Sequence, residues 1–154
     1  MIALIQRVTM ARVQVAGRTT GEIGAGLLAL IGVERHDQAA QGARLLERML
    51  DYRVFADAAG RMNRSLRDTA GGLLLVPQFT LVADTSSGNR PGFSGAAVPE
   101  QARALFGQLL DAARAAHAPV AAGAFGAHME LTLTNDGPVT FWLSAPPATA
   151  APEA

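Results

Sequence analysis

The sequence contains neither cysteine nor lysine, and each absence excludes a class of chemistry. Without cysteine the chain has no disulfide bond, thiol nucleophile or thiolate metal ligand. All 13 basic residues are arginine, so lysine Schiff bases and lysine general bases are excluded as well. The three histidines, His36, His117 and His128, lack metal-ligand spacing, and we interpret them as ordinary surface, helix-end and strand residues. We therefore expect neither a metal nor a cofactor.

Charge and long apolar runs are also scarce. Charged residues make up 17% of the chain and the formal net charge is zero, which excludes a broad electrostatic grip on nucleic acid. An RNA partner would have to be held locally, at an end or a loop. The low charge also predicts that a second subunit covers some apolar surface.

No stretch approaches the ~20 apolar residues of a membrane helix, and residues 1–7 do not resemble a signal peptide, so we expect a cytoplasmic protein without a membrane partner.

The familiar catalytic motifs are missing too. No serine sits in a G-x-S-x-G elbow, no Walker or Rossmann glycine pattern occurs, and no pair of carboxylates stands out. If the chain is an enzyme, its chemistry must come from less conventional groups.

What is present predicts one α+β domain. With 154 residues, 49% of them hydrophobic, the chain can form one substantial core. Glycine turns and β-branched residues predict short, mostly antiparallel strands forming a small barrel or sandwich, at residues 2–8, 12–15, 19–23, 27–33, 52–56, 73–76, 128–134 and 139–143. Helical spacing predicts two main helices, one capped by Asp37 and running to about Asp51, and one that begins at Pro99 and ends before Pro119. We place the domain at residues 1–144 and predict a disordered Ala/Pro-rich tail at residues 145–154.

Two polar segments do not fit this simple framework. Gln78-Phe79-Thr80 ends the apolar run at residues 73–76, and backbone N–H groups freed at a strand end can point at an oxyanion. The alternative is an ordinary strand end whose side chains cap local backbone. Asn135-Asp136-Gly137-Pro138 is the second segment. Its residues are typical of a hairpin turn, but Gly-Pro also permits a cis peptide at ~0.5–1 kcal/mol, which would aim two carbonyl groups the same way.

The two segments resemble the signature motifs of the D-aminoacyl-tRNA deacylase family. The matching stretches are Gln78-Phe79-Thr80-Leu81 and Asn135-Asp136-Gly137-Pro138-Val139-Thr140-Phe141-Trp142. Residues 1–8, 20–24 and 90–91 also fit the family in order and spacing, so that the resemblance covers nearly the whole chain up to Ser144.

The resemblance implies a homodimer whose active sites lie at the subunit interface. It implies that Gln78, Phe79 and Thr80 line the pocket for the aminoacyl-adenosine at the tRNA 3′ end, with the N–H groups of Phe79 and Thr80 as oxyanion hole. It further implies that a cis Gly137-Pro138 enters the partner's pocket, where its carbonyls hold the α-amino group of a D-amino acid and exclude L side chains. Arg7 would support this loop.

The resemblance therefore implies an ester hydrolase that acts on D-aminoacyl-tRNA and on glycyl-tRNA mischarged on tRNA(Ala). Water, helped by the terminal 2′-hydroxyl, is the expected attacking group, with Thr80 as the second candidate. One residue departs from the family pattern. The family usually has serine at the position of Pro77. Proline is found at this position in a related group that removes L-alanine, so L-alanyl-tRNA deacylation is an alternative.

Other interpretations also remain open. A tRNA 3′-end binding module without turnover and a purely structural dimerisation domain are the two alternatives from other classes. Asp84 and Arg90 are candidates for a rim near the terminal adenosine or a phosphate, against a solvated loop. Phe141 and Trp142 are interpreted as core or interface residues.

Overall fold

The computed structural model describes residues 1–147, and its centre is a mixed sheet that nearly closes into a barrel. The strands are β1 (Ile2–Val15), β2 (Arg18–Ile23), β3 (Gly26–Gly32), β6 (Gly72–Pro77), β7 (Val120–Ala122) and β8 (Glu130–Ser144). β1 pairs antiparallel with β2, β3 and β8, whereas β3–β6 and β6–β7 are parallel pairs. β2 packs against β7 where Gly21 lies against Ala122, which brings the ends of the sheet together. The predicted α+β class is confirmed.

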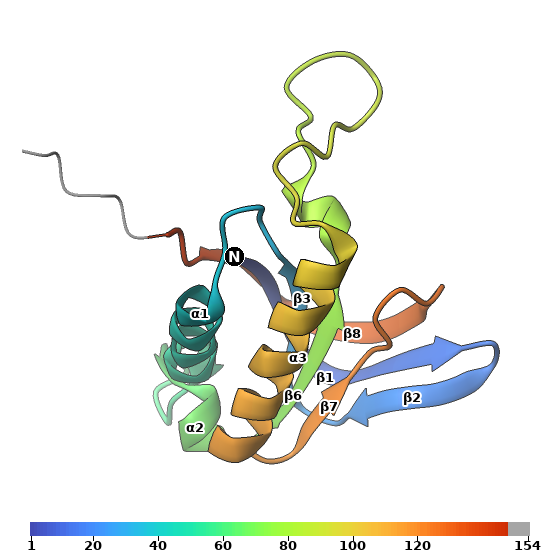
Figure 1. Cartoon of the computed structure of the whole chain (residues 1–154). Coiled ribbons are helices and arrows are strands. Elements are labelled where there is room, and N and C mark those ends of the chain that lie inside the picture. The colour runs from blue at the N-terminus through green and yellow to red at the C-terminus, as the bar shows by residue number, and fades with distance from the viewer. Residues whose placement is uncertain (148–154) are drawn as a thin grey trace, which may run out of the picture.

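Two helices cover one face of this sheet. α1 (Ala39–Asp51) and α3 (Pro99–Ala116) pack side by side on it (Figure 1). Their apolar faces join the main core, which includes Leu45, Met49, Leu105, Phe106 and Leu109. The smaller elements are α2 (Leu66–Thr69), a 3-10 helix η1 (Phe79–Val82) and a hairpin of β4 (Phe55–Ala56) and β5 (Met62–Arg64). No helix within residues 1–147 is both long and apolar enough to cross a membrane.

The opposite face of the sheet holds a second, smaller core. It contains Val8, Ala11, Val13, Leu28 and Leu74, all buried. Leu131 and Leu133 of β8 pack against this second core. On the same face of the sheet, Leu4 of β1 pairs with Leu30 of β3 and with Trp142 of β8.

The predicted cap of the first helix is wrong. Gln38, not Asp37, is the N-cap residue, and it forms a capping box with Gln41. Asp37 is buried, and its carboxylate accepts hydrogen bonds from the Met1 ammonium at 2.6 Å and from the Glu34 N–H at 2.7 Å. A buried carboxylate needs a charged partner, and Asp37 finds this partner at the distant N-terminus of the chain and not in the helix that follows it.

The boundary of the predicted tail is also wrong at its first residue. Ala145 is fully buried, its N–H donates to the Met1 carbonyl, and its carbonyl accepts from the Met1 ammonium. The ordered part of the chain therefore extends past Ser144. Residues 148–154 of the predicted tail lie outside the described residues.

Candidate active site

The predicted catalytic segment follows the buried strand β6 directly. Gln78 is tied to the end of β3 by its N–H, which donates to the Ile31 carbonyl at 2.7 Å. The chain then turns into η1, whose first two residues are Phe79 and Thr80. The first hydrogen bond inside this turn runs from the Leu81 N–H to the Gln78 carbonyl. The N–H groups of Phe79 and Thr80 therefore precede the internal hydrogen bonds of η1 and are available to an acceptor.

Gly32 at the end of β3 allows η1 to sit where it does. A Cβ at position 32 would lie 2.9 Å from Cγ2 of Val82 and 3.1 Å from Cβ of Leu81. Contacts this short require something to shift. A glycine on one strand thus sets the position of the segment that follows another strand.

Phe79 and Thr80 are exposed, and Gln78 is half-buried. Phe79 is 61% exposed, and its ring packs 5.1 Å, centroid to centroid, from that of Phe93. The Gln78 amide donates a hydrogen bond to the Thr80 hydroxyl. An amide cannot accept a proton from that hydroxyl, so this contact orients Thr80 but does not activate it as a nucleophile.

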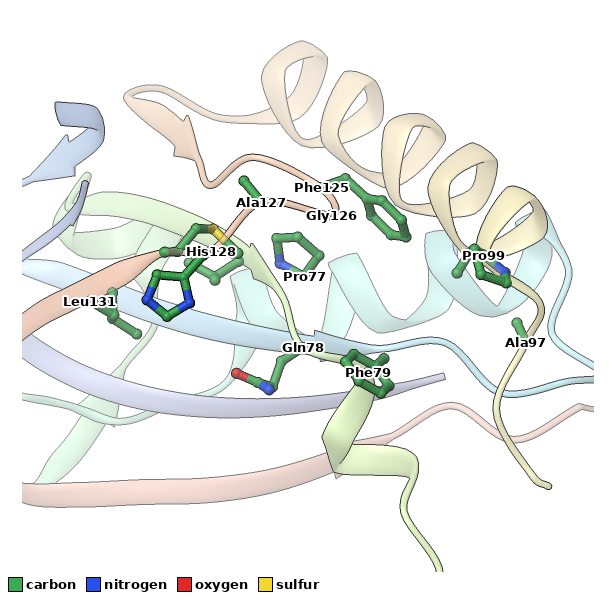
Figure 2. A pocket seen from close by; sticks show the side chains of 13 residues that line it. Pro77, Gln78, Phe79, Ala97, Pro99, Phe125, Gly126, Ala127, His128 and Leu131 are labelled. Carbon is green, nitrogen blue, oxygen red and sulfur yellow. The ribbon is translucent and has the colours of Figure 1, made fainter. Parts of the chain in front are cut away.

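A cavity of about 500 Å³ opens beside this segment (Figure 2). Pro77, Gln78 and Phe79 form one wall. Phe125 faces Pro77, and His128 and Pro99 lie toward opposite ends of the cavity. The remaining lining is mostly apolar and comprises Val76, Ala97, Ala102, Gly126, Ala127, Met129 and Leu131. A concave apolar site with a few polar groups is typical of a small-molecule or nucleoside pocket.

Much of this lining was not predicted from the sequence. His128 was interpreted as an ordinary strand residue, yet it lies just before β8 and lines the cavity. Phe125, Gly126 and Ala127 belong to the connection between β7 and β8, and they carry no catalytic side chain. Only the parallel β6–β7 pairing brings this connection over the end of β6, so no local pattern could have revealed it.

The second predicted segment forms a wide bulge within β8 and is not a hairpin turn. Thr140 pairs with Gln6 and Asn135 with Val8, so the chain between them loops out while β8 continues along β1. The Asn135 side chain closes the base of the loop, since its amide oxygen accepts from the Val139 N–H at 2.7 Å. At the tip, the Gly137-Pro138 bond is cis and both residues are exposed.

Arg7 lies directly beneath this bulge. Its Nε donates to the Asp136 carbonyl at 2.9 Å, and its Nη1 donates to the Val54 carbonyl at 2.6 Å. The Asp136 carboxylate adds an ion pair at 3.5 Å. The arginine thus joins the bulge to the segment that follows α1.

The structure does not bring all predicted residues together. Gly137, Pro138 and Arg7 do not line the cavity of their own chain. Asp84 and Arg90 do not line it either, and they belong to the loop that projects beyond η1 in Figure 1. Hydrogen bonds from the side chain and backbone of Ser86 hold the pKa of Asp84 below its usual value of 3.8, so this carboxylate stays ionised at neutral pH and is a weak base.

Solved structures share this fold over nearly the whole chain. One, titled as a structural analysis of a probable eukaryotic D-amino acid tRNA deacylase, covers 92% of this chain and 97% of its own, with a TM-score of 0.81 at 16% identity. Another, titled c-Myc DNA Unwinding Element Binding Protein, covers 95% of this chain and 99% of its own, with a TM-score of 0.90 at 36% identity. The first likeness shows the fold alone.

Sequence comparisons identify the protein family to which the chain belongs. The family model described as D-Tyr-tRNA(Tyr) deacylase matches residues 4–144. A D-aminoacyl-tRNA deacylase of Thioalkalivibrio sulfidiphilus is 64% identical over 96% of this chain and 99% of its own length. One of Xanthomonas oryzae pv. oryzae is 66% identical over 93% of this chain and 99% of its own. The chain belongs to the D-Tyr-tRNA(Tyr) deacylase family, which confirms the resemblance, and as a deacylase it is an enzyme of the hydrolase class.

Proposed function

We propose that this enzyme hydrolyses the ester bond of D-aminoacyl-tRNA, and of glycyl-tRNA mischarged on tRNA(Ala), to free amino acid and tRNA. Family membership and relatives that bear the name D-aminoacyl-tRNA deacylase at more than 60% identity support the reaction. The cavity beside Gln78, Phe79 and Thr80 would take the aminoacyl end, because its apolar walls suit a nucleoside and an amino-acid side chain.

Backbone groups supply the chemistry in this proposal. The N–H groups of Phe79 and Thr80 would donate to the carbonyl oxygen of the ester as negative charge develops on it. Because the hydrogen bond that the Thr80 hydroxyl receives comes from an amide, we favour attack by water, assisted by the terminal 2′-hydroxyl of the tRNA. Thr80 as a covalent nucleophile is the alternative.

Chiral selection would come from the partner subunit. The observation that carries this part is the separation of the two signature segments, because Gly137 and Pro138 are exposed on β8 and absent from the cavity of their own chain. A second copy that places its Gly137-Pro138 at this cavity would complete the site. The carbonyl groups there would accept hydrogen bonds from the α-ammonium of a D-amino acid, leaving no space for an L side chain.

An apolar patch supports the homodimer. Trp142 is 53% exposed and stands opposite Leu4, which in turn pairs with Leu30. These three side chains share one face of the sheet, and Gly137-Pro138 lies further along the same strand as Trp142. Leu4 and Leu30 are half-buried, and an exposed tryptophan beside such residues is typical of an interface.

L-Alanyl-tRNA deacylation is the second candidate, and Pro77 is the observation that favours it. Pro77 lines the cavity, so its ring contributes directly to the shape of the substrate pocket. If the pocket admitted an L-methyl group, alanine would be the first L-amino acid to enter.

The test is to incubate the enzyme with D-tyrosyl-, L-tyrosyl-, glycyl- and L-alanyl-tRNA and to follow ester loss over time. We expect loss of the D-tyrosyl and glycyl esters only, and a Thr80→Ala variant should keep most of the rate. Loss of L-alanyl ester alone would favour the second candidate. Binding of tRNA without loss of any ester would instead identify a 3′-end binding module.

A further inference from the structure

The cavity has almost no charge with which to meet a nucleic acid. Among the residues that line it, only His128 has an ionisable side chain, and none is an arginine, aspartate or glutamate. Under the proposed function, the nucleoside that enters this cavity remains attached to the rest of the tRNA through a phosphodiester. That phosphate carries a full negative charge, which a cation at the edge of the cavity would bind.

Arg103 is placed to provide this cation. It lies on α3 four residues after Pro99 and next to Ala102, both of which line the cavity, and it is itself exposed. Its guanidinium carbon is 4.7 Å from the centre of the Phe125 ring. Its Nη2 also lies against Gly126, where a Cβ would be only 3.3 Å away. Both Phe125 and Gly126 line the cavity, so the charge lies next to two successive lining residues.

The guanidinium is held in place without being neutralised. The contact of its carbon with the face of the Phe125 ring leaves the N–H groups at the edge of the guanidinium able to donate. None of the ion pairs within residues 1–147 involves Arg103. In contrast, Arg67 is neutralised by both Glu47 and Asp51.

From this placement we propose that Arg103 binds the phosphodiester that joins the terminal nucleoside of the tRNA to the preceding nucleotide. The inference rests on the proposed function and adds an anion subsite at the edge of the same cavity. A planar guanidinium donates two parallel hydrogen bonds to a phosphate, which would set how deeply the nucleoside enters. Arg103 is a substrate-binding residue in this view and takes no part in the bond-breaking step.

The experiment compares three substrates: the 3′-O-D-tyrosyl ester of adenosine, the 3′-O-D-tyrosyl ester of adenosine 5′-monophosphate, which adds only the phosphate, and D-tyrosyl-tRNA. With Arg103→Gln, we expect KM to rise about tenfold for the two substrates that carry a phosphate, since a hydrogen bond to a charged group is lost. Their kcat should not change, because the contact is the same in ground and transition states. The adenosine ester should be cleaved as by the wild type.

Salt dependence provides a second readout that a structural role would not affect. For D-tyrosyl-tRNA, the slope of log kcat/KM against log salt concentration should become shallower by about 0.7 in Arg103→Gln, the value for one contact with a single strand. Arg103→Lys should keep most of the slope. Arg114→Gln is the matched control, since Arg114 is an exposed arginine in the last turn of the same helix.

Each result has one meaning. Equal losses on all three substrates would show that Arg103 only supports the packing of Phe125, and unchanged kinetics on all three would show that it meets no phosphate. Either result would overturn the inference while leaving the proposed function intact. If the wild type cleaved no D-tyrosyl ester at all, the proposed function itself would fail.

Discussion

The side chains of Gln78, Phe79 and Thr80 include no strong acid or base, and the groups of interest are the two backbone N–H groups that begin η1. This arrangement agrees with a chain that has no cysteine or lysine to use. At the scale of single residues, the central question is whether an N–H group contributes to the reaction or merely lies nearby.

Phe79→Pro removes one of these N–H groups with little damage to the backbone. Proline is well tolerated at the first position of a helical turn, and Gln78 before it already has φ −143° and ψ 83°, outside the helical region that proline disfavours. Relative to Phe79→Ala, which loses the same ring but keeps the N–H, we expect kcat for D-tyrosyl-tRNA to fall about 100-fold. Single-turnover kinetics of the two variants would measure this. Equal rates would mean that the Phe79 N–H does not stabilise the oxyanion.

At the scale of elements, the site depends on how η1 packs against the end of β3. The backbone of Gln78 bonds to Ile31, and Leu81 and Val82 occupy the space that a side chain at position 32 would need. The proposed catalytic segment is thus positioned by a strand that would contribute no group to the chemistry.

Gly32→Ala should displace η1 and lower kcat for D-tyrosyl-tRNA by about tenfold or more, because small displacements of positioned groups are costly. It should also destabilise the fold by about 1–3 kcal/mol through overpacking. Kinetics together with thermal unfolding would test both effects. Gly24→Ala is the control, since a Cβ at position 24 meets no atom within 4 Å. A fully active Gly32→Ala would argue against tight placement of η1.

At the scale of the whole molecule, the cavity and the Gly137-Pro138 loop of one chain are separate, and this separation determines how a complete site could form. One chain presents a pocket at the end of β6 and an exposed loop on β8, and neither includes the other. In a symmetric dimer each chain would give its loop to its partner and receive one in return.

Mixing two inactive variants tests this exchange. Phe79→Pro damages the pocket. Gly137→Val damages the loop, because Gly137 has φ +150° and a Cβ there would lie 2.6 Å from Cγ2 of Val139. A hybrid dimer has one site with both parts intact, so random exchange of subunits should restore about a quarter of the wild-type sites. Activity on D-tyrosyl-tRNA and light-scattering mass would be measured before and after mixing. No recovery from well-exchanged dimers would place pocket and loop in the same subunit.

The sequence by itself determined the features that depend on near neighbours along the chain. Periodicity and turn residues predicted the α+β class and the two main helices, and the spacing of the two signature segments indicated the family. The absence of cysteine and lysine also restricted the possible chemistry, because composition does not depend on the fold.

Only the tertiary structure decided which distant segments meet. The parallel pairs β3–β6 and β6–β7 bring residues 125–129 over the end of β6 and create the cavity, although His128 is the only one of these residues with an ionisable side chain. In the same way Asp37 became a buried partner of the Met1 ammonium, and Arg103 came to stack on Phe125. Contacts between residues far apart in the chain depend on how the elements pack, and local propensity and spacing do not contain that information.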